Sequence, residues 1–80
     1  MERIALEKEI FTYVAKSYKK NVDEISCDTK FHVDLADNSM MQVALTSLIE
    51  EELDVSIDFL DLSQYATVGE LVDRVESELA

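Results

Sequence analysis

The side chains in this sequence that could do chemistry gather between Cys27 and Ser39. Cys27 is the single cysteine and His32 the single histidine, whereas a structural zinc site takes four such ligands. Asp34 could begin a calcium-binding loop. The sixth position of that loop would then be Ser39 where the loop needs Gly, and the twelfth would be Leu45 where it needs Glu. We therefore expect no metal site.

Ser39 and Cys27 are also the candidate nucleophiles of a small enzyme. No serine stands in a Gly-x-Ser-x-Gly sequence, and His32 is the one imidazole that could serve as a base. A chain of 80 residues has little core to spare for a substrate-sized pocket. We therefore expect a protein that is not an enzyme, with turnover by Ser39 or Cys27 as the alternative.

Ser39 is the residue best placed for chemistry, because it follows the acidic segment 34–38 at the point where a helical pattern begins. The N-terminal end of a helix offers free amides and a positive potential, which both suit a phosphate group. A serine, aspartate or asparagine at such a position also commonly caps the helix. The residues alone leave two interpretations open: Ser39 carries a phosphodiester, or Ser39, Asp37 or Asn38 merely caps the helix.

Apolar spacing predicts a first helix from Glu2 to about Lys20. Its apolar face consists of Ile4, Leu6, Ile10, Phe11, Val14 and Tyr18. Segment 21–38 has no sustained period, and we predict a long ordered loop, a feature that is often functional. The apolar residues expected to fix this loop to the core are Val22, Ile25, Phe31, Val33 and Leu35.

Helical spacing returns at about Ser39. The core face of this second helix is expected to consist of Met41, Leu45, Leu48, Ile49 and Leu53. A short helical turn is predicted from Asp58 to Gln64, anchored by Phe59, Leu60 and Leu62. Thr67 and Glu70 fit a capping box at the start of a last helix. Its apolar residues are Val68, Leu71, Val72, Val75 and Leu79.

The composition agrees with a helical fold, since the chain has no Pro and one Gly. We therefore predict one all-α domain over residues 1–80. The expected architecture is a small four-helix bundle with three main helices, one short helix and a long loop between the first and the second.

The net charge of −11 is unevenly distributed along the chain. Residues 1–30 contain six acidic and six basic side chains, whereas residues 31–73 contain ten acidic side chains and no Lys or Arg. Such a surface repels nucleic acid and anionic membranes and steers towards basic patches on partner proteins, although acidity also simply keeps small proteins in solution. One cysteine, no signal peptide and no run of about 20 apolar residues favour a cytoplasmic protein without membrane insertion.

From Phe31 onwards the chain resembles the acyl carrier protein family, in register and without a gap. The family pattern is a Phe, then Asp-Leu-Gly-x-Asp-Ser-Leu, a helix that ends in acidic residues, an Ile after a short gap, and a late Thr-Val. The matching elements here are Phe31, Asp34-Leu35-Ala36-Asp37-Asn38-Ser39-Met40, Glu50-Glu51-Glu52-Leu53-Asp54, Ile57 and Thr67-Val68. With the first helix and the long loop included, the resemblance covers nearly the whole chain.

The resemblance implies that Ser39 carries a 4'-phosphopantetheine arm, attached from coenzyme A by a phosphopantetheinyl transferase. The thiol of such an arm carries acyl or aminoacyl groups as thioesters, while the protein supplies placement and recognition. The implied partners are the transferase and acyl-loading and acyl-processing enzymes with basic docking patches, and the carrier itself is expected to be a monomer. The alternative is an unmodified acidic interaction module with a carrier-like fold.

The sequence departs from the family pattern around the serine. Asn38 stands for the family's Asp, Ala36 for its Gly and Met40 for its Leu. Met41 and Ala44 replace acidic residues early in the second helix. These departures predict a dedicated carrier for a specialised fatty acid, polyketide or related pathway, with a divergent primary carrier as the alternative. At least one of the two methionines is expected to be exposed. The residues expected to recognise partners are Asp37, Asn38, Met40, Met41, Glu50 and Glu51.

Overall fold

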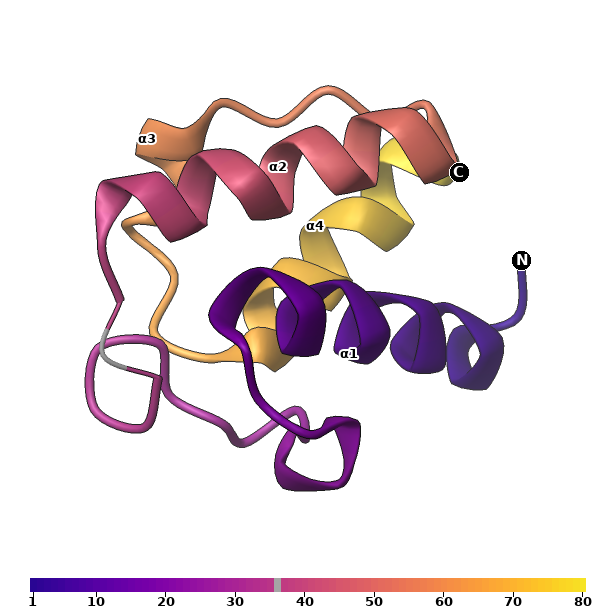
Figure 1. The fold of residues 1–80 in the computed structure, drawn as a ribbon. Helices are drawn as coiled ribbons and strands as arrows, with labels where there is room; N and C mark the ends of the chain where they lie inside the picture. The colour runs from indigo at the N-terminus through magenta and orange to yellow at the C-terminus, as the bar shows by residue number, and fades with distance from the viewer. Residues whose placement is uncertain (36) are drawn as a thin grey trace.

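The structure is a computed structural model that describes residues 1–35 and 37–80. Its elements are α1 (Arg3–Tyr18), the 3₁₀ helix η1 (Val22–Glu24), α2 (Ser39–Leu53), α3 (Phe59–Leu62) and α4 (Val68–Leu79). Figure 1 shows α1 and α2 side by side with α4 crossing behind them, while α3 packs on α2. The two termini lie at one end of the bundle, and the start of α2 lies at the other (Figure 1). The predicted all-α bundle, with its long first loop, is confirmed.

Helix α1 ends where the backbone of Lys19 turns left-handed, at φ 57° and ψ 49°, so that its N–H donates to the Ala15 carbonyl. The buried residues of α1 are Leu6, Ile10, Tyr13, Val14, Ala15 and Tyr18. Ile4, which we expected on this face, is 67% exposed. The reason is geometric, because Ile4 lies two residues before Leu6 and is therefore rotated roughly 200° around the helix axis.

The long loop is fixed to the core by three of the five apolar residues that the sequence suggested, namely Ile25, Phe31 and Leu35. Val22 and Val33 are exposed, and the prediction for them is wrong. Val22 belongs to the single turn η1 and faces solvent. Val33 lies in a tight turn, closed by a hydrogen bond of 2.8 Å from the Asp34 N–H to the Lys30 carbonyl, which leaves its side chain outside.

The same loop also binds the start of α4 through the backbone. The amides of Val68 and Gly69 donate to the carbonyls of Thr29 and Cys27, both over 2.9 Å. The predicted capping box is present: Thr67 accepts from the Glu70 amide, and the Glu70 carboxylate accepts from the Thr67 amide. The first-turn amides of α4 therefore find partners in the loop and in the cap, which ties loop and helix together.

The core lies between α1, α2 and α4 and closes over the loop. Its largest fully buried side chains are Phe31, Leu6, Ile10, Leu45, Ile49, Leu62, Leu71, Val14, Val68, Val72 and Val75. Phe59, Leu60 and Leu79 are exposed, contrary to expectation. The four-residue α3 has a single face against α2, and Leu62 occupies that face. Leu79 lies in the last turn of α4. Among the helices of the described segments, none is long and apolar enough to cross a membrane.

Candidate functional site

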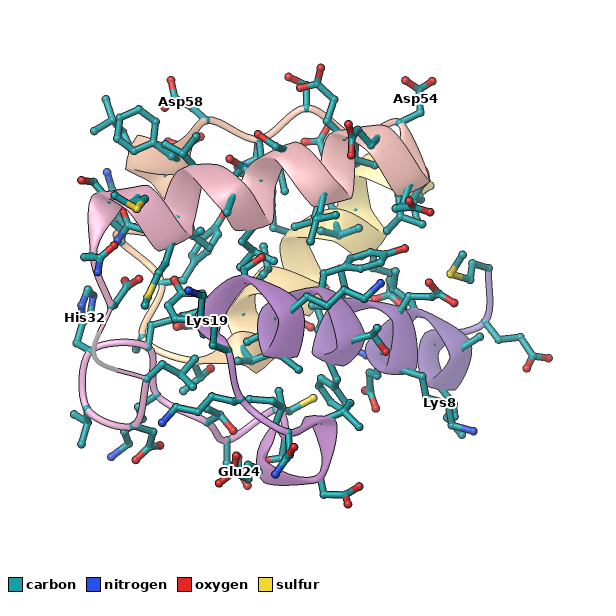
Figure 2. All side chains as sticks on the ribbon, in the orientation of Figure 1. Lys8, Lys19, Glu24, His32, Asp54 and Asp58 are labelled. Carbon is teal, nitrogen blue, oxygen red and sulfur yellow. The ribbon has the colours of Figure 1, made fainter. Side chains whose placement is uncertain are left out.

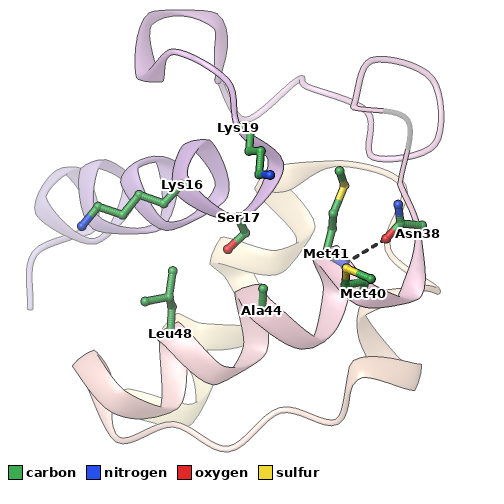
Figure 3. Close-up of a pocket in the computed structure, with 8 residues that line it drawn as sticks. All are labelled: Lys16, Ser17, Lys19, Asn38, Met40, Met41, Ala44 and Leu48. Carbon is green, nitrogen blue, oxygen red and sulfur yellow. Dashed lines mark hydrogen bonds between the residues drawn. The ribbon is translucent and has the colours of Figure 1, made fainter.

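Ser39 is the first residue of α2, and its side chain is exposed. The cap of this helix is the preceding residue, Asn38, whose side-chain oxygen accepts a hydrogen bond of 2.9 Å from the Met41 amide (Figure 3). No hydrogen bond joins the Ser39 hydroxyl to any of residues 1–35 or 37–80. Of the two interpretations that the sequence left open, capping therefore belongs to Asn38, and the Ser39 hydroxyl is accessible.

The segment before Ser39 is held by a buried carboxylate. The side chain of Asp37 is only 1% exposed. It accepts hydrogen bonds from the Tyr18 hydroxyl at the end of α1 and, over 2.7 Å, from the Gln42 amide in the first turns of α2. The Asp37 N–H donates to the Phe31 carbonyl at 3.3 Å. These contacts fix the chain between α1, the loop and α2, and so fix the position of the serine that follows.

Tyr18 is a donor in this cluster because its phenol keeps its proton. Burial, and then the hydrogen bond to Asp37, raise the pKa of Tyr18 well above its usual range. The ring packs on Phe31, with 5.9 Å between the ring centroids and 44° between the ring planes. A single tyrosine thus joins the aromatic core to the polar loop.

The two other candidate chemical groups are His32 and Cys27. His32 donates from Nε2 to the Ser63 carbonyl at 3.2 Å, and its Nδ1 lies 3.7 Å from the Asp37 carboxylate. Cys27 is half-buried, and burial raises the pKa of its thiol, with Glu7 nearby adding to the effect. A thiol that stays protonated is a weak nucleophile.

The two methionines that follow Ser39 differ in their surroundings. Met40 is 81% exposed, which confirms the prediction that at least one of the pair is exposed. Met41 is partly buried and packs against the core. Both line a pocket of about 360 Å³ between the end of α1 and the start of α2, opposite Ser17 and Lys19 (Figure 3). An apolar hollow therefore adjoins the attachment position expected from the sequence.

The far end of α2 is acidic. Glu50 and Glu51 are exposed, and with Ser47 and Asp54 they line a shallow hollow. The last turn of α2 contains no basic residue. In Figure 2, Asp54 and Asp58 lie on the outer side of α2 and α3, whereas Lys8 and Lys19 lie along α1. The two labelled lysines thus lie away from the acidic end of α2.

The residues expected to recognise partners take different places. Asn38, Met40, Glu50 and Glu51 are exposed, while Met41 is partly buried. The Asp37 side chain points inwards to Tyr18 and Gln42. Recognition of partners by these residues stays a prediction. Ala36, the residue at the position of the family's Gly, lies outside the described residues.

Sequence reasoning missed the residues that support the site from α1 and α2. Tyr18 was assigned to the apolar face without a partner for its hydroxyl, although a buried tyrosine usually needs one. Gln42 is buried on the core side of α2, between apolar neighbours, and its amide had to find an acceptor. These two polar groups, each of which needs a partner in the core, were the signal. Nothing in the sequence pointed to Ser17 or Lys19.

Comparison with known proteins agrees with this geometry. Residues 8–75, which include Ser39, match the family described as a phosphopantetheine attachment site. The chain is 35% identical over 80 residues to the acyl carrier protein of Thermotoga maritima, covering 95% of this chain and 99% of that protein. It is 32% identical over 66 residues to the acyl carrier protein of an Exiguobacterium species, covering 82% and 84%.

A third relative is longer than this chain. The mitochondrial acyl carrier protein of Saccharomyces cerevisiae is 39% identical over 69 residues. The match covers 80% of this chain and 55% of the yeast protein, so the chain spans about half the length of that relative.

Proposed function

The chain belongs to the acyl carrier protein family, and from that premise we propose that Ser39 is its attachment site and that the attached arm carries acyl groups. The cofactor of the family is a covalently bound 4'-phosphopantetheine. The protein is therefore a carrier, and the enzymes that load and process the cargo are separate proteins.

One observation supports Ser39 above the other serines: its hydroxyl is exposed at the first position of α2, while Asn38 performs the capping. The residues present fit a phosphodiester at this position. The first turn of a helix presents amides and a positive potential towards an anion. The Asp37 carboxylate, which would repel a phosphate, is turned inwards and bonded to Tyr18 and Gln42.

The division of work follows from what each group can do. When bound, the arm supplies a terminal thiol that carries acyl groups as thioesters. The chain supplies the Ser39 hydroxyl oxygen, which forms a bond to phosphorus as the hydroxyl loses its proton. The nucleotide part of coenzyme A is the leaving group. The cluster around Asp37 holds the start of α2 so that the hydroxyl is presented to the transferase.

Partner enzymes dock on the acidic end of α2, where Glu50 and Glu51 are exposed. Near the serine, Met40 offers an exposed apolar contact. Met41 and Ala44 stand where the family pattern has acidic residues that could form salt bridges. This mixed surface supports a dedicated carrier in a specialised fatty acid, polyketide or related pathway.

The test is loading in solution. The unmodified protein is incubated with coenzyme A and a phosphopantetheinyl transferase, and the intact mass is measured. We expect the mass to increase by one phosphopantetheine group, the increase to vanish in Ser39→Ala, and the control Ser47→Ala, at an exposed serine of the same helix, to load normally. A wild-type protein that gains no mass would instead be an unmodified interaction module.

A further inference from the structure

The pocket beside Ser39 has an apolar wall from α2, formed by Met40, Met41, Ala44 and Leu48. Its edge begins at the attachment position, because Asn38 and Met40, the two neighbours of Ser39, both line it. The volume of about 360 Å³ is that of a small-ligand site. Figure 3 shows Met41, Ala44 and Leu48 on the side of α2 that faces α1, with Met40 at the start of the helix.

The opposite wall adds an unsatisfied polar group. The Ser17 Oγ atom is buried and has no hydrogen-bond partner in the described part of the chain. In Figure 3 it points from α1 into the space between the two helices. Buried polar atoms are nearly always paired, so a hydroxyl of this kind in a pocket wall suits a ligand with amide or hydroxyl groups.

Lys19 adds a positive charge at the rim. Within the described residues, no carboxylate lies within 4.0 Å of the Lys19 amine. The backbone of Lys19 is left-handed, at φ 57°, a conformation that favours glycine. Figure 3 shows Lys19 reaching towards Met41, whereas the amine of Lys16 points away. Since residues 31–73 contain no Lys or Arg, a negative group on Ser39 can find a cationic side chain only from outside α2.

We propose that this pocket between α1 and α2 holds the phosphopantetheine arm of the carrier itself, an inference that rests on the proposed attachment at Ser39. Lys19 faces the phosphodiester, Met41 and Ala44 contact the branched apolar part of the arm, and Ser17 bonds one of its polar groups. Because the arm is tethered at the pocket edge, its effective concentration there is about millimolar, and weak contacts suffice.

The experiment uses nuclear magnetic resonance on the protein labelled at its Met, Ala and Leu methyl groups, before and after loading with phosphopantetheine. Loading is first verified by intact mass. We expect the methyl resonances of Met41 and Ala44 to shift on loading. We also expect nuclear Overhauser contacts between them and the geminal methyl groups of the arm.

Matched variants separate the pocket from general effects. Ala44→Phe fills the pocket and should abolish the arm contacts of Met41. Val43→Phe places the same phenylalanine at an exposed position of α2 outside the pocket, and the arm contacts of Met41 should remain. Lys19→Gln should reduce the contact intensities at least twofold, whereas Lys20→Gln, next in sequence but not lining the pocket, should not.

The outcomes distinguish this inference from the proposed function. No mass increase in the wild-type protein would overturn both. A full mass increase without contacts between the arm and Met41 or Ala44 would overturn only the pocket assignment. Equal contacts in Lys19→Gln and Lys20→Gln would remove Lys19 from the site. These lysine variants keep the pocket testable if Ala44→Phe does not fold.

Discussion

At the start of α2 two neighbouring polar residues have separate roles. Asn38 bonds the Met41 amide and so satisfies one of the free amides of the helix. Ser39, one residue later, is inside the helix, where its hydroxyl is not needed as a cap. A modification at Ser39 therefore leaves the hydrogen bond that begins α2 in place.

This division predicts different stability losses for two adjacent substitutions. Asn38→Ala should lower the free energy of unfolding by about 1 kcal/mol, the usual value of an N-cap. Ser39→Ala should change it by less than about 0.5 kcal/mol, as at an ordinary surface site. Urea unfolding followed by circular dichroism measures both. Equal losses would mean that Ser39 shares the cap.

The carboxylate of Asp37 is a second feature at the scale of the residue, since it depends on the Tyr18 hydroxyl. Tyr18→Phe should lower the free energy of unfolding by about 1–3 kcal/mol, because a buried carboxylate loses a donor. Tyr13→Phe is the matched control. Its hydroxyl bonds the exposed Glu9 over 2.8 Å, so its loss should be smaller. Equal losses in urea unfolding would argue against a special role for Asp37.

The same tyrosine predicts a dependence on alkaline pH. An unfolded tyrosine loses its proton near pH 10, whereas burial and Asp37 raise the pKa of Tyr18 in the folded state. Above about pH 10 the unfolded state therefore binds fewer protons than the folded state, and stability falls as pH rises. The fall should be weaker in Tyr18→Phe. An unchanged slope in that variant would contradict the assignment.

At the scale of the elements, periodicity predicted the four α-helices and approximately where they begin, but not the 3₁₀ helix η1 inside the loop. The last helix and its capping box were readable because Thr67 and Glu70 stand at the required spacing. The errors fell at helix ends and in single turns, as at Ile4 and Leu60. The spacing of apolar residues shows which side of a helix faces the core. It does not show how far the neighbouring element extends to cover that side.

The junction between the loop and α4 depends on the chain's single glycine. A Cβ atom on Gly69 would lie 3.0 Å from the Cys27 carbonyl oxygen and 3.2 Å from its Cβ. Alanine is about 1 kcal/mol better than glycine inside a helix. The nearest contact is a backbone carbonyl that also accepts from the Gly69 amide, so we expect the steric cost to exceed this gain.

Gly69→Ala should therefore lower the melting temperature. Ser77→Ala, at an exposed position of the same helix, is the control and should leave it unchanged or raise it slightly. A Gly69→Ala protein that melted higher than the wild type would show that the loop moves aside easily.

At the scale of the whole molecule, the sequence predicted the position of the candidate site but not its support. Ser39 could be singled out because its motif is local in the chain. Tyr18 and Asp37 are separated by 19 positions, and their contact depends on how the loop returns to α1. The pocket between α1 and α2 is likewise a product of packing, to which Ser17 and Lys19 contribute from the end of one helix.

The acidic end of α2 predicts how the whole molecule meets partner enzymes. Reversal of Glu50 and Glu51 to Lys should slow loading by a transferase at low carrier concentration, and added salt should slow loading of the wild type. The reversal places cations at a helix C-terminus, where they stabilise the helix, so unfolding would not explain the loss. Asp23→Lys with Asp28→Lys makes the same change in net charge in the loop, and should load almost normally. Similar rates for both pairs would exclude docking on α2.

Attachment of the carrier arm to Ser39 is tested most directly by fragmentation mass spectrometry of the loaded protein. Trypsin leaves residues 31–74 as one peptide, because no Lys or Arg lies between Lys30 and Arg74. We predict that fragments ending at Asn38 have the unmodified mass, and that those extending through Ser39 carry one phosphopantetheine group. An added mass that appears only in fragments beyond Met40, or on Cys27, would contradict it.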